Sequence, residues 1–142
     1  MYRNILLPVD LSDKHSWRKA MPTALALRQT FQATLHVMTV VPDFGLPMVG
    51  QSFPSDYEAK MHEHVAAQLA DFVAEQVPED VPAQRIVAAG NVYHEILTTA
   101  EKIGADLIVM GSHRPELSDY LLGPNAARVV RHADCSVMVV RE

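Results

Sequence analysis

Apolar residues gather in short runs along the chain, mostly without alternating polar positions. Four strong runs cover residues 5–9, 34–41, 107–110 and 136–140, and a weaker one covers residues 85–89. Continuous apolar runs of this length are typical of strands in a parallel sheet that is covered on both faces. The pattern therefore predicts five buried strands.

The segments between these runs have helical spacing. The clearest covers residues 57–77, whose apolar face consists of Met61, Val65, Leu69, Phe72 and Val73. Further helices are expected over residues 13–31, 91–103 and 123–133. Pro22 predicts a kink or a late start in the first of these, and Gly104 is a candidate C-cap for the second.

Strand and helix thus alternate, which predicts an α/β fold: a doubly wound, Rossmann-like parallel sheet with helices on both faces. Ligands of such sheets bind at the carboxyl ends of the strands, where the strand order reverses. Residues 41–55 contain three prolines and two glycines and are expected to form a long loop.

Length and composition narrow the class of protein. A chain of 142 residues, 49% hydrophobic and 20% charged, fits a single soluble domain over residues 1–142. The net charge of −5 argues against nucleic-acid binding through a basic surface. We expect a cytoplasmic protein with no membrane association, because the chain has one cysteine, no signal-peptide pattern and no apolar stretch of about 20 residues.

A glycine-containing loop follows the fourth strand. Gly111 comes directly after the run ending at Met110, and Gly123 precedes Pro124 at the start of the last helix. Glycine allows a close backbone approach or a positive φ, and a helix N-terminus attracts anions. This pattern is compatible with a phosphate cradle, and equally with glycines that serve only to turn the chain.

Several stretches, taken in order, resemble the universal stress protein family. They are Ile5-Leu6-Leu7-Pro8-Val9-Asp10, Leu35-His36-Val37, Gly90-Asn91-Val92 with Glu95-Ile96, the segment from Ala105 to His113, and the segment from Cys135 to Arg141. The resemblance covers essentially the whole chain. Gly-Ser-His-Arg-Pro and Leu-Leu-Gly-x-Asn-Ala are most similar to the F- and G-type bacterial members.

The resemblance implies a five-stranded sheet, a homodimer through the C-terminal strand, and a stress-response module that binds ATP, with ADP or AMP as alternatives and Mg²⁺ at the phosphates. It places the nucleotide against Pro8, Val9, Asp10, Val37, Met110, Gly111, Ser112, His113, Arg114, Gly123, Pro124 and Asn125. Adenine would lie near Asp10 and Val37. Pro124 departs from the serine or threonine usual in nucleotide-binding members, and so removes a hydroxyl and an N–H.

Each candidate residue has a plainer interpretation. Asp10 could be a helix N-cap, although Ser12 and Asp13 compete for that role. His62 and His64 do not share a helix face, so solvated side chains are expected there and no metal site. Cys135 is expected to be a small buried hydrophobe without a reactive thiol.

Three functions remain open at this point. The first is the homodimeric nucleotide-binding module, and the second is a dimer that has lost nucleotide and acts through unidentified protein partners. The third is an adenine-nucleotide enzyme, for which no residue stands out as a general base. The apolar residues 137–140 favour a dimer in each case, because an edge strand would expose backbone groups that a second copy could pair.

Overall fold

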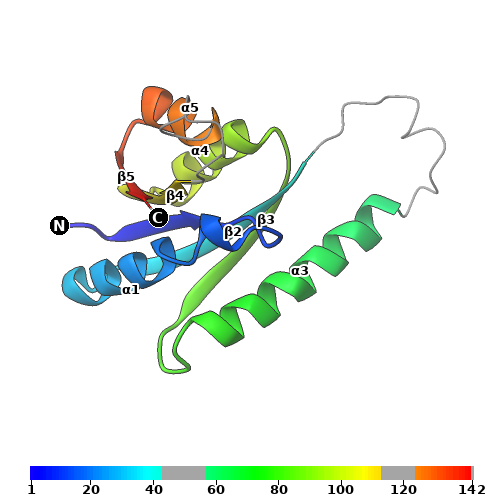
Figure 1. Cartoon of the computed structure of the whole chain (residues 1–142), viewed down its shortest axis with the longest axis horizontal. Coiled ribbons are helices and arrows are strands. Elements are labelled where there is room, and N and C mark those ends of the chain that lie inside the picture. Colours follow the sequence, from blue (N-terminus) through cyan, green and yellow to red (C-terminus); the bar gives the residue numbers. More distant parts are fainter. Residues whose placement is uncertain (43–56, 113–123, 142) are drawn as a thin grey trace.

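The computed structural model describes residues 1–42, 57–112 and 124–141. These residues form one five-stranded parallel sheet with the strand order β3-β2-β1-β4-β5, covered by helices on both faces (Figure 1). The strands are β1 (Asn4–Pro8), β2 (Thr34–Pro42), β3 (Ala83–Gly90), β4 (Leu107–Ser112) and β5 (Ser136–Arg141). All five predicted strands are thus present, and the doubly wound fold is confirmed.

The described helices also follow the predicted segments. They are α1 (Ala20–Phe31), α3 (Tyr57–Gln76), α4 (Val92–Ile103) and α5 (Pro124–His132), with a short 3₁₀ turn η1 (Lys14–Ser16) ahead of α1. No helix within the described ranges is both long and apolar enough to cross a membrane.

Local chemistry accounts for where these helices begin and end. Pro22 delays the start of α1 to Ala20 and is the third residue of the helix. Its missing N–H costs nothing there, because the first N–H groups of a helix have no partner within it. Asn91 caps α4 by accepting a bond from the His94 N–H, and Gly104 ends it in the left-handed region at φ 67°. The late start and the glycine C-cap were both predicted.

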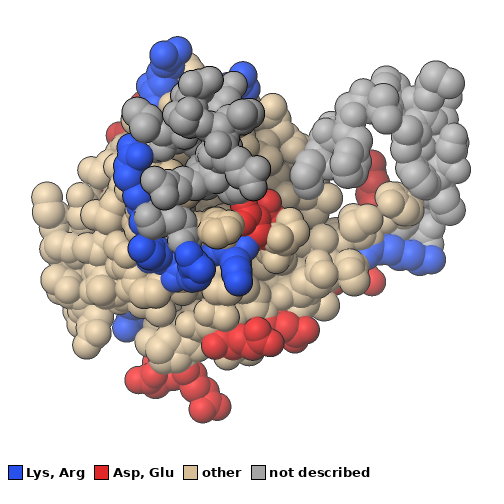
Figure 2. Space-filling model, viewed as in Figure 1, with Lys and Arg blue, Asp and Glu red and all other residues tan. Residues whose placement is uncertain are grey.

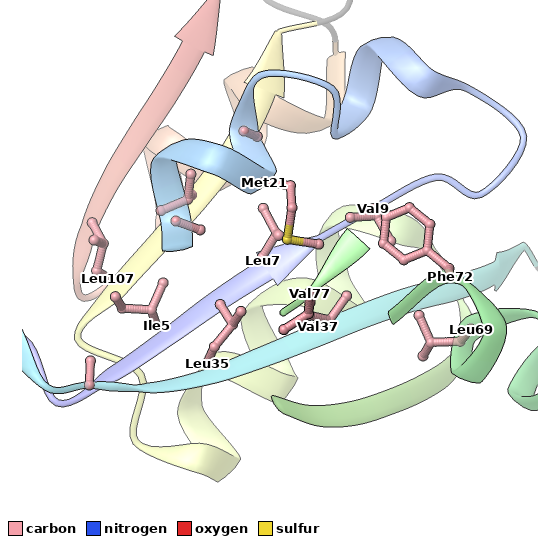
Figure 3. Packing of buried hydrophobic residues seen from close by; sticks show 14 residues of the cluster. Ile5, Leu7, Val9, Met21, Leu35, Val37, Leu69, Phe72, Val77 and Leu107 are labelled. Atoms are coloured by element: carbon pink, nitrogen blue, oxygen red, sulfur yellow. The ribbon is translucent and has the colours of Figure 1, made fainter. Parts of the chain in front are cut away.

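Alternate residues of each strand supply two separate cores. Ile5, Leu7, Leu35 and Val37 face the layer of α1 and α3, and Figure 3 shows Met21 lying over Leu7 in that layer. Residues of the opposite parity face α4 and α5, among them Leu6, Met38, Ile108 and Met110. A strand residue therefore belongs to one layer or the other according to its parity.

The chain order fixes where the sheet can hold a ligand. The sheet grows from β1 through β2 to β3 on one side, and the chain then returns to place β4 on the other side of β1. The strand order therefore reverses between β1 and β4, which is the point where open α/β sheets bind ligands at the carboxyl ends of their strands.

Candidate functional site

A cavity of about 530 Å³ opens at this switch point. Its volume is in the range of small-molecule sites. The described residues that line it come from β1, the turn that follows it, η1, β2, α4, β4 and α5: Pro8, Val9, Asp10, Ser12, Asp13, Ser16, Met38, Val40, Val92, Ile96, Met110, Gly111, Pro124, Asn125 and Ala126.

The apolar wall of the cavity is a continuation of the α4/α5 core. Met38, Ile96, Met110 and Ala126 are all buried and belong to that core as well as to the lining. The Val9 N–H donates to the Met38 carbonyl oxygen at 2.8 Å and thereby extends the β1–β2 pairing up to the cavity. Two strands and two helices thus contribute to this apolar wall.

The polar side of the cavity is the segment between β1 and η1, which hydrogen bonds to itself. One Asp10 carboxylate oxygen, Oδ1, accepts from the Ser12 N–H at 3.0 Å and from the Ser12 hydroxyl at 2.7 Å. The Asp10 N–H donates to Ser16 Oγ at 2.8 Å, and that hydroxyl lies 2.8 Å from the Asp13 carbonyl oxygen. These bonds tie the segment to itself, and Asp10 accepts in a side-chain turn in place of the N-cap role considered from the sequence.

Asp13 takes the capping role instead. Its carboxylate accepts from the His15 N–H at 3.0 Å at the start of η1. One of the two residues that competed with Asp10 in the sequence is thus the cap, which leaves Asp10 in the lining.

Gly111 meets the first of the two reasons expected for a glycine, a close backbone approach, and not the second, a positive φ. Its φ is not positive, and a Cβ added there would lie 2.4 Å from the Ser16 carbonyl oxygen and 2.8 Å from that of His15. The close approach that requires glycine is therefore made by the backbone of η1, which crosses the end of β4 and forms part of the cavity wall. This is a structural reason for Gly111 that holds with or without a ligand.

Seven of the predicted site residues line the cavity together. They are Pro8, Val9, Asp10, Met110, Gly111, Pro124 and Asn125. Three further candidates, His113, Arg114 and Gly123, lie outside the described residues.

Val37 and Ser112 are described but are not among the lining residues. The Val37 side chain is fully buried in the α1/α3 layer, because odd-numbered residues of β2 face that layer and even-numbered residues face the cavity. Ser112 is the last residue of β4 and is 2% exposed.

Sequence reasoning missed the neighbours of Val37 on the same strand. Met38 and Val40 have the opposite parity and line the cavity. The signal was available in principle, since residues at i and i+1 of a strand face opposite ways, but an unbroken apolar run does not tell which parity faces which layer. Ser16, Val92 and Ile96 were missed because the sequence does not show which helices border the switch point.

Charge is unevenly distributed near the cavity mouth. Figure 2 shows basic side chains over the segment between β1 and α1, where Lys14, Arg18 and Lys19 are exposed, and acidic side chains over α3. The charged side chains in the described lining are those of Asp10 and Asp13.

Two titratable groups away from the cavity are perturbed. Burial lowers the pKa of His36, whose Nε2 lies 3.1 Å from Asn4 Oδ1. Burial, with the charges of Asp106 and Asp134, raises the pKa of the half-buried Cys135 thiol. Cys135 is thus less buried than the sequence predicted, and its raised pKa makes the reactive thiolate scarcer.

The described residues include no group of three His, Cys, Asp or Glu side chains placed to hold a metal ion. His62 and His64 are exposed on α3, as expected for solvated side chains.

Known proteins match this chain in sequence and in fold over nearly its whole length. The model of the universal stress protein family matches residues 1–141. Universal stress protein G of Escherichia coli O157:H7 is 32% identical, with 99% of this chain and 100% of that protein covered. The solved structure of the protein MJ0577 is 25% identical with a TM-score of 0.75, covering 100% of this chain and 97% of that one.

Two more distant solved structures show the same fold and contain nucleotides. A universal stress protein in complex with cAMP is 16% identical with a TM-score of 0.70, and covers 98% of this chain and 97% of that one. A universal stress protein family member from Arabidopsis thaliana with AMP bound is 18% identical with a TM-score of 0.63, and covers 99% and 92%. With sequence, fold and near-complete coverage in agreement, this chain belongs to the universal stress protein family.

Proposed function

We propose that the chain binds an adenine nucleotide in the cavity between β1 and β4 and acts as a regulatory binding module. The observation that carries this proposal is the cavity of about 530 Å³ at the switch point, with seven of the predicted site residues in its lining. The cAMP and AMP bound by two proteins of the same fold support an adenine ligand.

The lining residues suit the parts of such a ligand. Met38, Val40 and Ile96 offer apolar surface for a purine ring, which would bury its faces without competing for hydrogen bonds. Asp10 uses one oxygen for Ser12, so its second oxygen is available to accept from a ribose hydroxyl or an amino group. The first residues of α5, from Pro124 to Ala126, also line the cavity, and the N–H groups of a helix N-terminus favour a phosphate.

The resemblance extends the proposal to ATP with Mg²⁺ and to a homodimer formed through β5. Support for the dimer comes from the position of β5 at the edge of the sheet and from Met138, which is 37% exposed on that strand. An edge strand with an exposed apolar residue can pair with a second copy and so complete its backbone hydrogen bonds. A nucleotide-dependent change in such a dimer would be the regulatory output.

Calorimetry on the nucleotide-free protein tests the site. About 23 non-hydrogen atoms in AMP at about 0.3 kcal/mol each give about −7 kcal/mol, or a Kd on the order of 10 μM. Val92→Trp should weaken AMP binding at least about tenfold by filling the cavity, since about 1.4 kcal/mol of lost contact suffices. Val130→Trp is the matched control, because Val130 is 46% exposed on α5 and is not among the lining residues.

Two results would count against this function. Unchanged AMP affinity in Val92→Trp would move the ligand elsewhere on the protein. The absence of binding heat with any adenine nucleotide, at several temperatures, would favour the nucleotide-free dimer that acts through protein partners. Pro124 supports this second function, because it removes an N–H from the cavity wall.

A further inference from the structure

The helix α5 is a thinly anchored part of the cavity wall. It has nine residues, of which Ala126 and Val129 are buried. Helices shorter than about 12 residues are marginal on their own, so the position of such a helix depends on its contacts with the rest of the protein. Its first three residues, from Pro124 to Ala126, line the cavity. The shape of that wall therefore depends on what holds α5 in place.

A cation–π contact joins α5 to α4, its neighbour on the same face of the sheet (Figure 1). The Arg128 guanidinium carbon lies 4.9 Å from the centre of the Tyr93 ring. A cation within about 6 Å of a ring centre is attracted to the face of the ring. His132 follows one turn later on α5, and its ring centre lies 6.4 Å from that of Tyr93. Because residues four apart share a helix face, Tyr93 lies against a single ridge of α5.

Both members of this contact lie next to the residues that line the cavity. Tyr93 is the second residue of α4 and packs against the core of the α4/α5 layer. Val92 precedes it and Ile96 follows one turn later, and both line the cavity. Arg128 lies one turn after Pro124 on α5. The contact thus joins the two helix segments that border the cavity, while neither Tyr93 nor Arg128 is among the described lining residues.

From this arrangement, we infer that Tyr93 and Arg128 are positioning residues of the nucleotide cavity: their contact holds α5 against α4 and so keeps the first turn of α5 in the cavity wall. The inference rests on the proposed function, because it concerns the same cavity. Neither side chain has to touch the ligand. If the ligand needs α5 in its docked position, the apparent affinity is reduced by the fraction of molecules in which α5 is docked.

Calorimetry with AMP on the wild-type protein and on Tyr93→Leu tests the inference. A cation–π contact at an exposed site changes an equilibrium constant about two- to fivefold, so Tyr93→Leu should weaken AMP binding by about that factor. Leucine keeps an apolar side chain that favours a helix, and it changes no charge. A weaker attraction for the phosphate therefore cannot explain the loss. Tyr93→Phe keeps the ring and should bind AMP as the wild-type protein does.

Arg128 is tested with a matched control for charge. Arg128→Gln should weaken AMP binding by about the same factor as Tyr93→Leu, and Arg128→Lys, which keeps the cation, should lie closer to the wild-type protein. Arg131→Gln removes the same charge from another exposed position of α5 and should leave AMP affinity unchanged. The double variant Tyr93→Leu/Arg128→Gln should bind no more weakly than the weaker single variant, because the two side chains act through one contact.

These affinities can be separated from a general loss of stability. A fivefold change in the folding equilibrium leaves nearly all molecules of an ordinary domain folded. A change in AMP affinity of the expected size therefore reports on the cavity, and rescue by Tyr93→Phe and Arg128→Lys ties it to the ring and the cation.

The outcomes separate this inference from the proposed function. Unchanged AMP affinity in Tyr93→Leu would overturn the inference and leave the adenine-nucleotide function standing. Equal losses in Arg128→Gln and Arg131→Gln, or losses that add in the double variant, would also overturn it, because charge or independent effects would then explain the data. Failure of the wild-type protein to bind any adenine nucleotide would refute the function, and the inference with it.

Discussion

Replacing Gly111 with alanine should disturb the fold and the cavity together. The added Cβ would lie 2.4 Å from the Ser16 carbonyl oxygen and 2.7 Å from its carbonyl carbon, and both are backbone atoms that cannot rotate away. Ordinary contacts begin at about 3.4 Å, so η1 would have to move by about 1 Å. Overpacking of this kind costs about 1–3 kcal/mol of unfolding free energy.

The displaced segment is also part of the cavity wall. Ser12, Asp13 and Ser16 lie in it and line the cavity, so Gly111→Ala should weaken AMP binding as well as stability. Unfolding in urea can be followed by the fluorescence of Trp17, the single tryptophan, which lies 5.0 Å from the Phe72 ring. The midpoint urea concentration should fall by about 0.5 M for each kcal/mol lost, at an m-value of about 2 kcal/mol/M.

Gly104→Ala is the control for this prediction. Gly104 has φ 67° and nothing within 4 Å of an added Cβ, so alanine there costs only the strain of the left-handed region, about 1–2 kcal/mol. It ends α4 and is not among the lining residues, so AMP binding should survive in the folded fraction. If Gly111→Ala kept wild-type stability and AMP affinity, the contact between η1 and β4 would not matter as argued.

Three further predictions concern regions away from the cavity. Burial lowers the pKa of His36 below 6.5, so the unfolded chain binds more protons between the folded pKa and 6.5. The free energy of unfolding, measured in urea, should therefore fall as the pH drops through that window. The fall should be smaller in His36→Gln, and an equal fall in the variant would contradict this. Met138→Asp should convert a β5-paired dimer to monomer in sedimentation, while a monomeric wild-type protein or an unaffected dimer would refute edge pairing. Cys135 should react with a thiol reagent near pH 8 more slowly in the folded than in the urea-unfolded protein, because its pKa is raised, and equal rates would contradict that.

The sequence predicted the layers of this fold well because each strand is a separate apolar run. Pro22, Asn91 and Gly104 also marked helix ends by local chemistry that does not depend on distant residues. The strand ends that reach the site could therefore be predicted from position alone, since strand ends of a parallel sheet meet at one edge.

The site was predicted less completely, for physical reasons. Val37 faces the α1/α3 core and Met38 faces the cavity. Which of the two faces which layer depends on the helix that covers each side of the sheet, and this is a property of the tertiary structure. The requirement for glycine at position 111 comes from the Ser16 backbone, which lies 95 residues away in the chain. Contacts between distant segments leave no local pattern in a single sequence.

The most direct test of the account is the mapping of AMP on the folded protein by amide chemical shifts. Binding in the cavity should move the signals of four lining residues: Asp10 in the turn after β1, Ser16 in η1, Met38 in β2 and Ala126 in α5. Signals on the exposed surface of α3 should stay in place, as should that of Cys135, which is not among the lining residues. Shifts confined to those outer positions, or no shifts at saturating AMP, would contradict a nucleotide site between β1 and β4.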